Sequence, residues 1–304
     1  MTSTPTSSIS ISAPAKINLG LEILGKRADG FHEIRTLMAM LEFGDHLTLS
    51  TAPESTVHGV PGVSQDTNLI LRAVDAFRQA TEPPIHVCVS AIKRIPMASG
   101  LGGASADAAA TILALNALVS DPLPDEALRE LAASLGSDVP FFLGSPLALG
   151  SGTGTELLPR TPVPFDILLI VPNLTIPNKT GTMYGMLDAS DCSDGTRIEN
   201  GVRALAKREF PDRQSLANTF ERPLYALAPV LIALRRTLES LDSLGVGLSG
   251  AGPAHYVVSR PGRALQTEYE VRALMPPGIS IISTHARLSG LHPDLRSQPD
   301  RRSG

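Results

Sequence analysis

A run of small residues that leads directly into an alanine-dense segment constrains this chain more than any other feature. Residues 95–107 read IPMASGLGGASAD, and small side chains at 99–105 let the backbone approach a ligand closely. Alanine is the best helix former, so residues 106–118 are predicted to be a helix. The first N–H groups of a helix have no intrahelical partner and form its positive end. The sequence therefore predicts a phosphate site, unless Ser105 or Asp107 simply caps the helix.

Composition places the chain among ordinary globular proteins and argues against a nucleic-acid partner. The 304 residues are 42% hydrophobic and 18% charged, which is far from the composition of disordered chains. This length predicts two domains or one large fold. The formal net charge is −4 and no long basic run occurs, whereas nucleic-acid binders usually show a clustered basic face. We therefore expect small-molecule partners and no nucleic acid.

The cysteines and the apolar segments predict a cytoplasmic protein. Cys88 and Cys192 lack metal-type spacing and are too few for a disulfide framework. No apolar stretch approaches the roughly 18–20 residues that span a bilayer, and residues 1–8 lack the features of a secretory signal. We expect no membrane association and no dedicated metal site.

Periodicity and turn signals predict an α+β chain in two halves. Strands are expected at residues 11–25, 37–50 (with a turn at Gly44–Asp45), 85–89, 139–149, 166–171, 254–258 and 279–284, the last of them final. Helices are expected at residues 68–80, 106–118, 124–135 (ended by Gly136 as a C′ glycine) and 227–241. A proline-rich stretch at 158–165 divides the chain into domains at 11–160 and 165–290, with flexible tails at 1–10 and 291–304.

Two common nucleotide-binding motifs are excluded. The Walker A pattern is absent from the sequence. A literal G-x-G-x-x-G occurs at residues 245–250, but it follows a predicted helix rather than a strand, so the dinucleotide-binding context fails. Residues 245–252 are instead expected to form a second glycine-rich loop.

Several motifs in chain order resemble those of the GHMP kinases. The run at 95–107 resembles their phosphate loop, P-x-G-x-G-L-x-S-S-A, and more narrowly the pattern P-x-G-x-G-L-G-G-G-S-S-D-A-A of some members. Relative to this longer pattern, Ala98, Ala104 and Ala106 stand where the family usually has Gly, Gly and Ser. Similar segments are residues 13–21 (P-A-K-I-N-L), 26–34 (R-x-D-G-Y-H-x-L), 136–142 (G-x-D-V-P-F-F), 218–221 (N-D-F-E) and 248–252 (M-S-G-S-G). On these motifs, spread over roughly residues 11–258, the chain is identified as a member of the family. Segment 26–34 resembles the members that act on a cytidine-diphosphate-linked polyol.

The resemblance implies both a fold and a reaction. The fold would be the two-domain α+β GHMP architecture, with an N-terminal half like the second domain of ribosomal protein S5 and a ferredoxin-like C-terminal half. The reaction would transfer the γ-phosphoryl group of ATP, with Mg²⁺, to the 2-hydroxyl of the polyol in non-mevalonate isoprenoid synthesis. A monomer or weak dimer is expected.

For catalysis, the resemblance pairs Asp138 with Lys16. Asp138 would take the proton from the attacking hydroxyl, while Lys16 keeps the carboxylate ionised and screens charge in the transition state. Taken alone, Lys16 reads as a solvated lysine beside a strand, and Asp138 reads as a cap or turn residue.

For binding, the resemblance assigns three groups of residues. ATP would contact the loop (Pro96, Met97, Ala98, Ser99, Gly100, Leu101, Gly102, Gly103, Ala104, Ser105 and Ala106) and, near the adenine, Asn68 and Lys93. Asn68 could instead cap a helix, and Lys93 could be a solvated strand end. The acceptor would contact Asn18, Phe31, His32 and Tyr184. Phe31 and Tyr184 would sandwich a cytosine whose edge the backbone at His32 reads, unless both aromatic rings only pack.

Two other functions remain open at this level. Another GHMP kinase would act on homoserine, mevalonate or a mevalonate diphosphate, although segment 26–34 favours the cytidyl substrate. A nucleotide-binding regulator without catalysis is the other, although the presence of both Lys16 and Asp138 argues against it.

Overall fold

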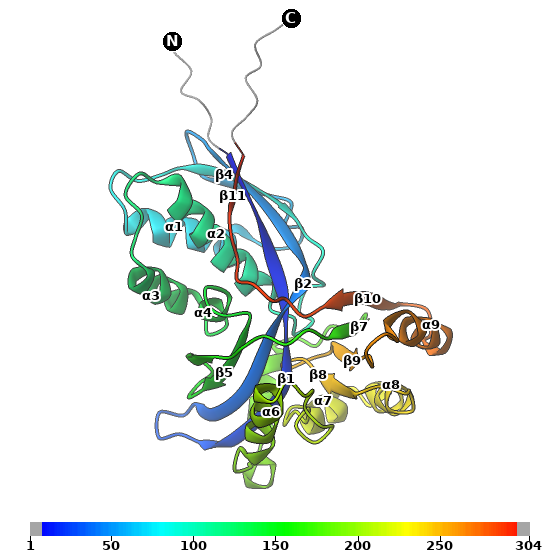
Figure 1. The fold of residues 1–304 in the computed structure, drawn as a ribbon. Coiled ribbons are helices and arrows are strands. Elements are labelled where there is room, and N and C mark those ends of the chain that lie inside the picture. The colour runs from blue at the N-terminus through cyan, green and yellow to red at the C-terminus, as the bar shows by residue number, and fades with distance from the viewer. Residues whose placement is uncertain (1–7, 297–304) are drawn as a thin grey trace, which may run out of the picture.

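Two β-sheets organise the chain in a computed structural model that describes residues 8–296 (Figure 1). The larger sheet has the order β11-β1-β2-β4-β3, with β5 paired to β2 and β6 paired to β5. Its strands are β1 (Ser8–Lys26), β2 (His32–Thr51), β3 (Thr56–His58), β4 (Val87–Ile92), β5 (Leu147–Ser151), β6 (Glu156–Pro159) and β11 (Asp294–Arg296).

The smaller sheet contains β7 (Asp166–Pro172), β8 (Gly245–Leu248), β9 (His255–Val258) and β10 (Ile279–His285). Its strands are antiparallel in the order β10-β7-β9-β8. Numbered within this half, that order is 4-1-3-2, the arrangement of a ferredoxin-like sheet. The expected α+β fold with a ferredoxin-like C-terminal half is confirmed.

The helices divide between the two sheets (Figure 1). Those of the N-terminal half are α1 (Leu69–Gln79), α2 (Gly103–Leu118), α3 (Asp125–Leu135) and α4 (Val139–Phe142). Those that follow β7 are α5 (Lys179–Gly185), α6 (Thr196–Ala206), α7 (Glu221–Leu227), α8 (Val230–Glu239) and α9 (Ala264–Leu274), with single 3₁₀ turns at Gln65–Thr67 and Ala189–Asp191. Among residues 8–296, no helix is long and apolar enough to cross a membrane.

The two sheets share a hydrophobic core, which joins the two halves. β7 is apolar at nearly every position because both of its faces are buried, and side chains alternate between faces along a strand. Ile167 and Leu169 pack with Ile17 of β1 in the core between the sheets. Leu168 and Ile170 pack on the opposite side with the helices of the C-terminal half. A third core lies between the larger sheet and α1, α2 and α3. The domain division at 158–165 stays a prediction.

The long hairpin of β1 and β2 carries the polar side chains of the cleft. The two strands are antiparallel over most of their length, and the pairing shifts between Pro14 and Lys16 and between Asn18 and Gly20. Bulges of this kind re-aim side chains and are common next to functional sites. Between the two shifts, Lys16 and Asn18 are two residues apart and so point to the same face.

Several expected elements differ in the structure. The turn predicted at Gly44–Asp45 is wrong, since β2 continues through it and Gly44 pairs with Pro14. A Cβ on Gly44 would lie 2.4 Å from the carbonyl oxygen of Ala13, so the glycine permits a close approach of two strands. The expected strand at 139–149 begins only at Leu147, because the first four residues form α4.

Other corrections concern chain ends and glycines. The strand expected to be final is followed by β11, which pairs with Ser8–Ser10 of β1, so the predicted tails are too long at both ends. Their remaining residues, 1–7 and 297–304, lie outside the described residues. Within the predicted loop at 245–252, the first four residues form β8. Gly136 does end α3, but its φ of 166° is extended rather than left-handed.

Replacing Gly44 with alanine is expected to destabilise the protein, because the added methyl group meets main-chain atoms that cannot move aside. Overpacking of this kind typically costs about 1–3 kcal/mol of unfolding free energy. The control is Gly25→Ala in β1, where no heavy atom lies within 4 Å of the added methyl group. Denaturant unfolding measures both variants, and equal midpoints would contradict the close packing at Gly44.

Candidate active site

Two cavities meet at the glycine loop, which we define as residues 96–105, and a third cavity adjoins one of them. The loop cavity, of about 570 Å³, lies between the loop and the start of α1. The lysine cavity, of about 540 Å³, contains Lys16 and Asp138. Ala98, Gly100 and Gly102 line both, so the loop is their common wall. A rim cavity of about 500 Å³ adjoins the lysine cavity.

The structure brings most of the predicted residues to these cavities. All ten loop residues line the loop cavity together with Asn68 and Lys93. Ala106 lines none of the three, because it is fully buried within α2. The lysine cavity is lined by Lys16, Asn18, Asp138 and Tyr184, and the rim cavity by Phe31, His32 and again Tyr184.

The glycine loop depends on a left-handed backbone at Gly102, the residue before α2. Its φ is 74°, and a Cβ there would lie 2.8 Å from Cγ of Lys16 and 3.0 Å from Cζ of Phe142. Only glycine fits this position without displacing the cleft lysine. The backbone N–H of Lys16 donates to the carbonyl of Leu101 at 2.9 Å, which fixes the loop against β1.

The three alanines that depart from the family motif have different consequences. Ala98 has a φ of 53°, a left-handed conformation that costs an L-residue about 1–2 kcal/mol. Ala104 and Ala106 lie in α2, where alanine is more favourable than the glycine at 104 by about 1 kcal/mol and is also a better helix former than the serine at 106. Only the alanine at 98 therefore strains the loop.

Lys16 is the centre of a buried polar chain. Its ammonium donates to Oδ1 of Asn18 at 2.7 Å and lies 3.6 Å from Oδ2 of Asp138. Nδ2 of Asn18 donates to Oγ1 of Thr36 at 2.8 Å, and that hydroxyl donates to the carbonyl of Gly20 at 2.7 Å. The Lys16 side chain is 5% exposed and that of Asp138 is 42% exposed. The cation is thus held rigidly, while the carboxylate is open to the cavity.

A turn from the C-terminal half, residues 249–252, supports the loop from the other side. The Ser249 hydroxyl donates to the carbonyl of Gly100 at 2.9 Å, and the Ala254 N–H donates to that of Ser99 at 3.0 Å. Nδ2 of Asn218 donates to the carbonyls of Leu248 and Gly250, each at 2.9 Å. The segments that resemble N-D-F-E and M-S-G-S-G therefore act together, as supports of the loop.

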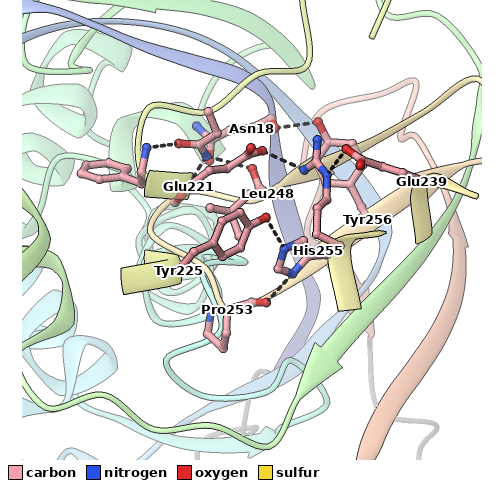
Figure 2. Close-up of polar contacts among 12 residues, drawn as sticks. Asn18, Glu221, Tyr225, Glu239, Leu248, Pro253, His255 and Tyr256 are labelled. Carbon is pink, nitrogen blue, oxygen red and sulfur yellow. Dashed lines mark hydrogen bonds and ion pairs between the residues drawn. The ribbon is translucent and has the colours of Figure 1, made fainter. Parts of the chain in front are cut away.

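A buried histidine next to this turn is structural (Figure 2). Burial lowers the pKa of His255 to about 4, so the ring is neutral near pH 7. Its Nδ1–H donates to the carbonyl of Pro253 at 3.0 Å, and Nε2 accepts from the Tyr225 hydroxyl at 3.0 Å. Figure 2 also shows the Tyr256 hydroxyl, which donates to the carbonyl of Asn18 at 3.0 Å. These contacts tie β9 to the cleft strand β1.

Asn68 and Lys93, the two residues expected near an adenine, also have structural partners. Oδ1 of Asn68 accepts from the N–H of Ile70 at 3.0 Å and so caps α1. The Lys93 ammonium bonds to the carboxylates of Asp45 and Asp107, both almost fully buried. Burial raises the pKa of Asp107 to about 7, against the opposing effect of Lys93. Lys93 is therefore no solvated strand end.

The aromatic side chains at the rim are arranged differently from the predicted sandwich. The ring stacked on Tyr184 is that of His32, with 5.0 Å between centroids and 27° between planes. Phe220 lies edge-on to Tyr184 at 4.9 Å, and Phe31 is 65% exposed. Burial and the Asp138 carboxylate raise the pKa of the Tyr184 phenol, so it is neutral at physiological pH.

Lys179 is a cleft residue that the sequence analysis missed. It lies at the start of α5 and lines the lysine cavity. Its ammonium donates to the carbonyl of Ala98 at 2.7 Å and also to that of Gly252. In this part of the chain, the resemblance implies a role for Tyr184 but none for Lys179. No local pattern places a lysine of the C-terminal half on a loop 80 residues earlier.

Sequence comparisons match these features to one family. Residues 68–145 match the GHMP kinases N terminal domain and residues 202–276 match the GHMP kinases C terminal domain. A 4-diphosphocytidyl-2-C-methyl-D-erythritol kinase of Symbiobacterium thermophilum is 36% identical over 251 residues, which are 80% of this chain and 88% of the relative. A Deinococcus radiodurans protein of the same name is 36% identical over 286 residues, 91% of this chain and 92% of its own.

Solved structures agree with the sequence matches. A crystal structure of 4-(cytidine 5'-diphospho)-2C-methyl-D-erythritol kinase superposes with a TM-score of 0.78 at 33% identity, covering 91% of this chain and 98% of the other. A homoserine kinase from Cytophaga hutchinsonii superposes with a TM-score of 0.75 over 97% and 99% of the two chains, but at 16% identity it supports the fold alone.

The two-sheet fold, the glycine loop and the lysine–aspartate pair together define a GHMP kinase. At the observed identity and coverage the chain belongs, within that class, to the 4-diphosphocytidyl-2-C-methyl-D-erythritol kinases.

Replacing Lys93 with methionine is expected to destabilise the enzyme strongly, because two buried carboxylates would face each other without a cation. Removing one partner of a buried ion pair typically costs about 3–5 kcal/mol. The loss should shrink as the pH falls toward 7, since Asp107, which in the variant lacks the pKa-lowering effect of Lys93, then takes up a proton and the repulsion disappears. Thermal unfolding at pH 5.5 and pH 8 measures this, with the exposed Lys207→Met as control. If Lys93→Met were as stable as the wild type at both pH values, this would contradict a structural role for Lys93.

Proposed function

We propose that this enzyme transfers the γ-phosphoryl group of ATP to the 2-hydroxyl of 4-diphosphocytidyl-2-C-methyl-D-erythritol, a step of non-mevalonate isoprenoid synthesis. The observation that carries the proposal is the junction of the loop cavity and the lysine cavity at Gly100 and Gly102. A nucleotide in the first cavity would present its terminal phosphate to the Lys16–Asp138 pair in the second. The shared name of the relatives supports the acceptor.

The phosphates of ATP would lie along the glycine loop. The N–H groups of the loop and of the first turn of α2 are donors of the kind that bind phosphate, and α2 is 16 residues long. The adenine would occupy the loop cavity near Asn68, while Lys93 would hold the cavity wall through its two carboxylates.

Magnesium fits this cleft as a partner of ATP rather than as a resident metal. Among residues 8–296, no group of three or more His, Cys, Asp or Glu side chains could hold a metal ion. Mg²⁺ is commonly bound through substrate phosphates and water with one or two protein oxygens. The Ser105 hydroxyl would be the protein donor, and the ion would neutralise charge on the phosphates.

The chemistry would follow from the open carboxylate beside the buried cation. Asp138 would accept the proton of the 2-hydroxyl while the oxygen of that hydroxyl bonds to the γ-phosphorus. The bond from the γ-phosphorus to the bridging oxygen would break, and ADP would leave. Lys16 would stay beside the reacting groups, because Asn18 and Asp138 hold its ammonium in place. Phosphoryl transfer depends mainly on such positioning and electrostatics.

The acceptor would extend from the lysine cavity into the rim cavity. The two cavities share Ser137, Thr153 and Tyr184, so one elongated ligand can occupy both. The polyol would lie near Asp138 and Asn18, and the cytosine near Phe31, His32 and Tyr184. Because the His32 ring is stacked on Tyr184 in this structure, a base would contact Tyr184 only after that ring moves.

The competing functions have less support. Homoserine and mevalonate kinases share the fold, but at 16% and 12% identity they support no acceptor for this chain. Lys16 and Asp138 are present and paired, which disfavours an inactive regulator. A cytoplasmic location, a monomeric or weakly dimeric state and the absence of nucleic-acid binding stay predictions.

Replacing Asp138 with asparagine is expected to lower kcat by roughly 10²–10⁴-fold, the usual contribution of a positioned general base. ATP affinity should change little, because the adenine and most of the phosphates lie elsewhere. Adding Lys16→Met should reduce kcat by less than the product of the two single effects, since residues that act as a unit are not additive. A coupled ADP-release assay measures kcat, with the exposed Asp125→Asn as control. Near-normal kcat in Asp138→Asn would overturn the assignment of the base.

Replacing Tyr184 with alanine is expected to raise the KM for the cytidyl acceptor and leave the KM for ATP unchanged. Stacking on a base typically contributes about 1–3 kcal/mol, which corresponds to a KM increase of about fivefold or more. The exposed Tyr269→Ala serves as control. If both KM values rise together with a loss of stability, Tyr184 only packs against Phe220. A wild-type enzyme that prefers homoserine or mevalonate would overturn the acceptor itself.

A further inference from the structure

Two lysine ammonium groups line the lysine cavity, but only one of them has a carboxylate partner. Lys16 is paired with Asp138. Lys179 has two carbonyl partners, Ala98 and Gly252, and within residues 8–296 it forms no ion pair. Carbonyl oxygens satisfy its donors but do not neutralise its charge.

The environment of Lys179 disfavours its charge as long as no anion is present. Its side chain is partly buried between α5, the glycine loop and the 249–252 turn. Burial, and secondarily the charge of Lys16, lower the pKa of Lys179 to about 8. A cation held in such a place gains more from an anionic ligand than an exposed lysine does, because the ligand offsets both effects.

The contacts of Lys179 also define where such an anion would lie. Ala98 belongs to the wall between the two large cavities, and its carbonyl accepts from Lys179 at 2.7 Å. Lys16 approaches the same region, since a Cβ on Gly250 would lie 3.4 Å from both its Nζ and the carbonyl oxygen of Gly100. Both ammonium groups thus lie beside the loop residues that separate the two large cavities.

We propose that Lys179 binds the terminal phosphate of ATP as a second cation, reaching it from the C-terminal half while the loop amides bind it from the N-terminal half. This proposal rests on the proposed function and names a further residue for the transferred group. Lys179 exchanges its carbonyl contacts for phosphate oxygens when ATP is present. It then links α5 to the terminal phosphate instead of to the carbonyl groups of Ala98 and Gly252.

A substitution at Lys179 can distinguish binding of the terminal phosphate of ATP from binding of the other phosphates of the two substrates. In Lys179→Met, which keeps the length of the side chain and removes the charge, affinity for a non-hydrolysable ATP analogue should fall about tenfold or more, as expected for a lost charge-assisted hydrogen bond. Affinities for ADP and for CDP should change less than about twofold, because neither ligand has that phosphate. The matched control is Lys207→Met, which removes an exposed charge on another surface.

Isothermal titration calorimetry with the three nucleotides decides among the outcomes. A selective loss for the ATP analogue supports the proposal. Equal losses for the ATP analogue and ADP would show that Lys179 only supports the loop, and a loss confined to CDP would assign it to the diphosphate of the acceptor. Either result overturns the proposal. None of these titrations requires turnover, so failure of the wild-type enzyme to phosphorylate the acceptor would count against the proposed function alone.

The pH dependence supplies a second readout that does not rely on Lys179→Met folding. Because the ammonium is charged below a pKa of about 8 and neutral above it, binding of the ATP analogue to the free wild-type enzyme should weaken as the pH rises from 7 to 9.5. In Lys179→Arg the guanidinium stays charged over this range, so the decline should disappear while binding is retained. The same decline in Lys179→Arg as in the wild type would contradict the proposal.

Discussion

The buried ammonium of Lys16 is the constraint on which the rest of the cleft depends. A buried cation is tolerated only when it is hydrogen-bonded and paired, and Asn18 and Asp138 meet these needs from two different elements. Asn18 is in turn fixed by Thr36, so the β1–β2 hairpin holds the site rigidly. The same lysine sets the size limit at Gly102, where any Cβ would press on its side chain. The β1 strand, the glycine loop and the start of α4 are thus arranged around the ammonium of Lys16.

The C-terminal half contributes to this cleft mainly through hydrogen bonds to main-chain carbonyl groups. Ser249 and Ala254 bond to loop residues, and Asn218 holds the turn that positions them. The core between the sheets also joins β1 to β7, so the two halves form the cleft together. Lys16 and Asp138, the proposed catalytic pair, lie on the N-terminal half, while the other half supports the loop and lines part of the lysine cavity.

Local sequence pattern was sufficient to predict an element where helix or strand propensity and burial favoured the same structure. The alanine-rich run of α2, the alternation in β4 and the apolar β7 were predicted because propensity and burial agree there. Prediction failed at Gly44, where a glycine that suggests a turn is needed for close strand packing, and at Val139–Phe142, where an apolar run forms one turn of helix. The contact at Gly44 has no local signal, because its partner atoms belong to Ala13 and Pro14, whereas Asp138 and Pro140 are local helix signals that the apolar pattern obscured.

The sequence by itself determined the family, and it predicted phosphate binding at the glycine loop and the pairing of Lys16 with Asp138, because these depend on residue types in a fixed order. Only the tertiary structure decided what surrounds them. It placed His32 against Tyr184, gave Lys93 two buried carboxylates and brought Lys179 to the loop. Those contacts join residues from distant parts of the chain, and burial, not spacing, determines their charges and their partners.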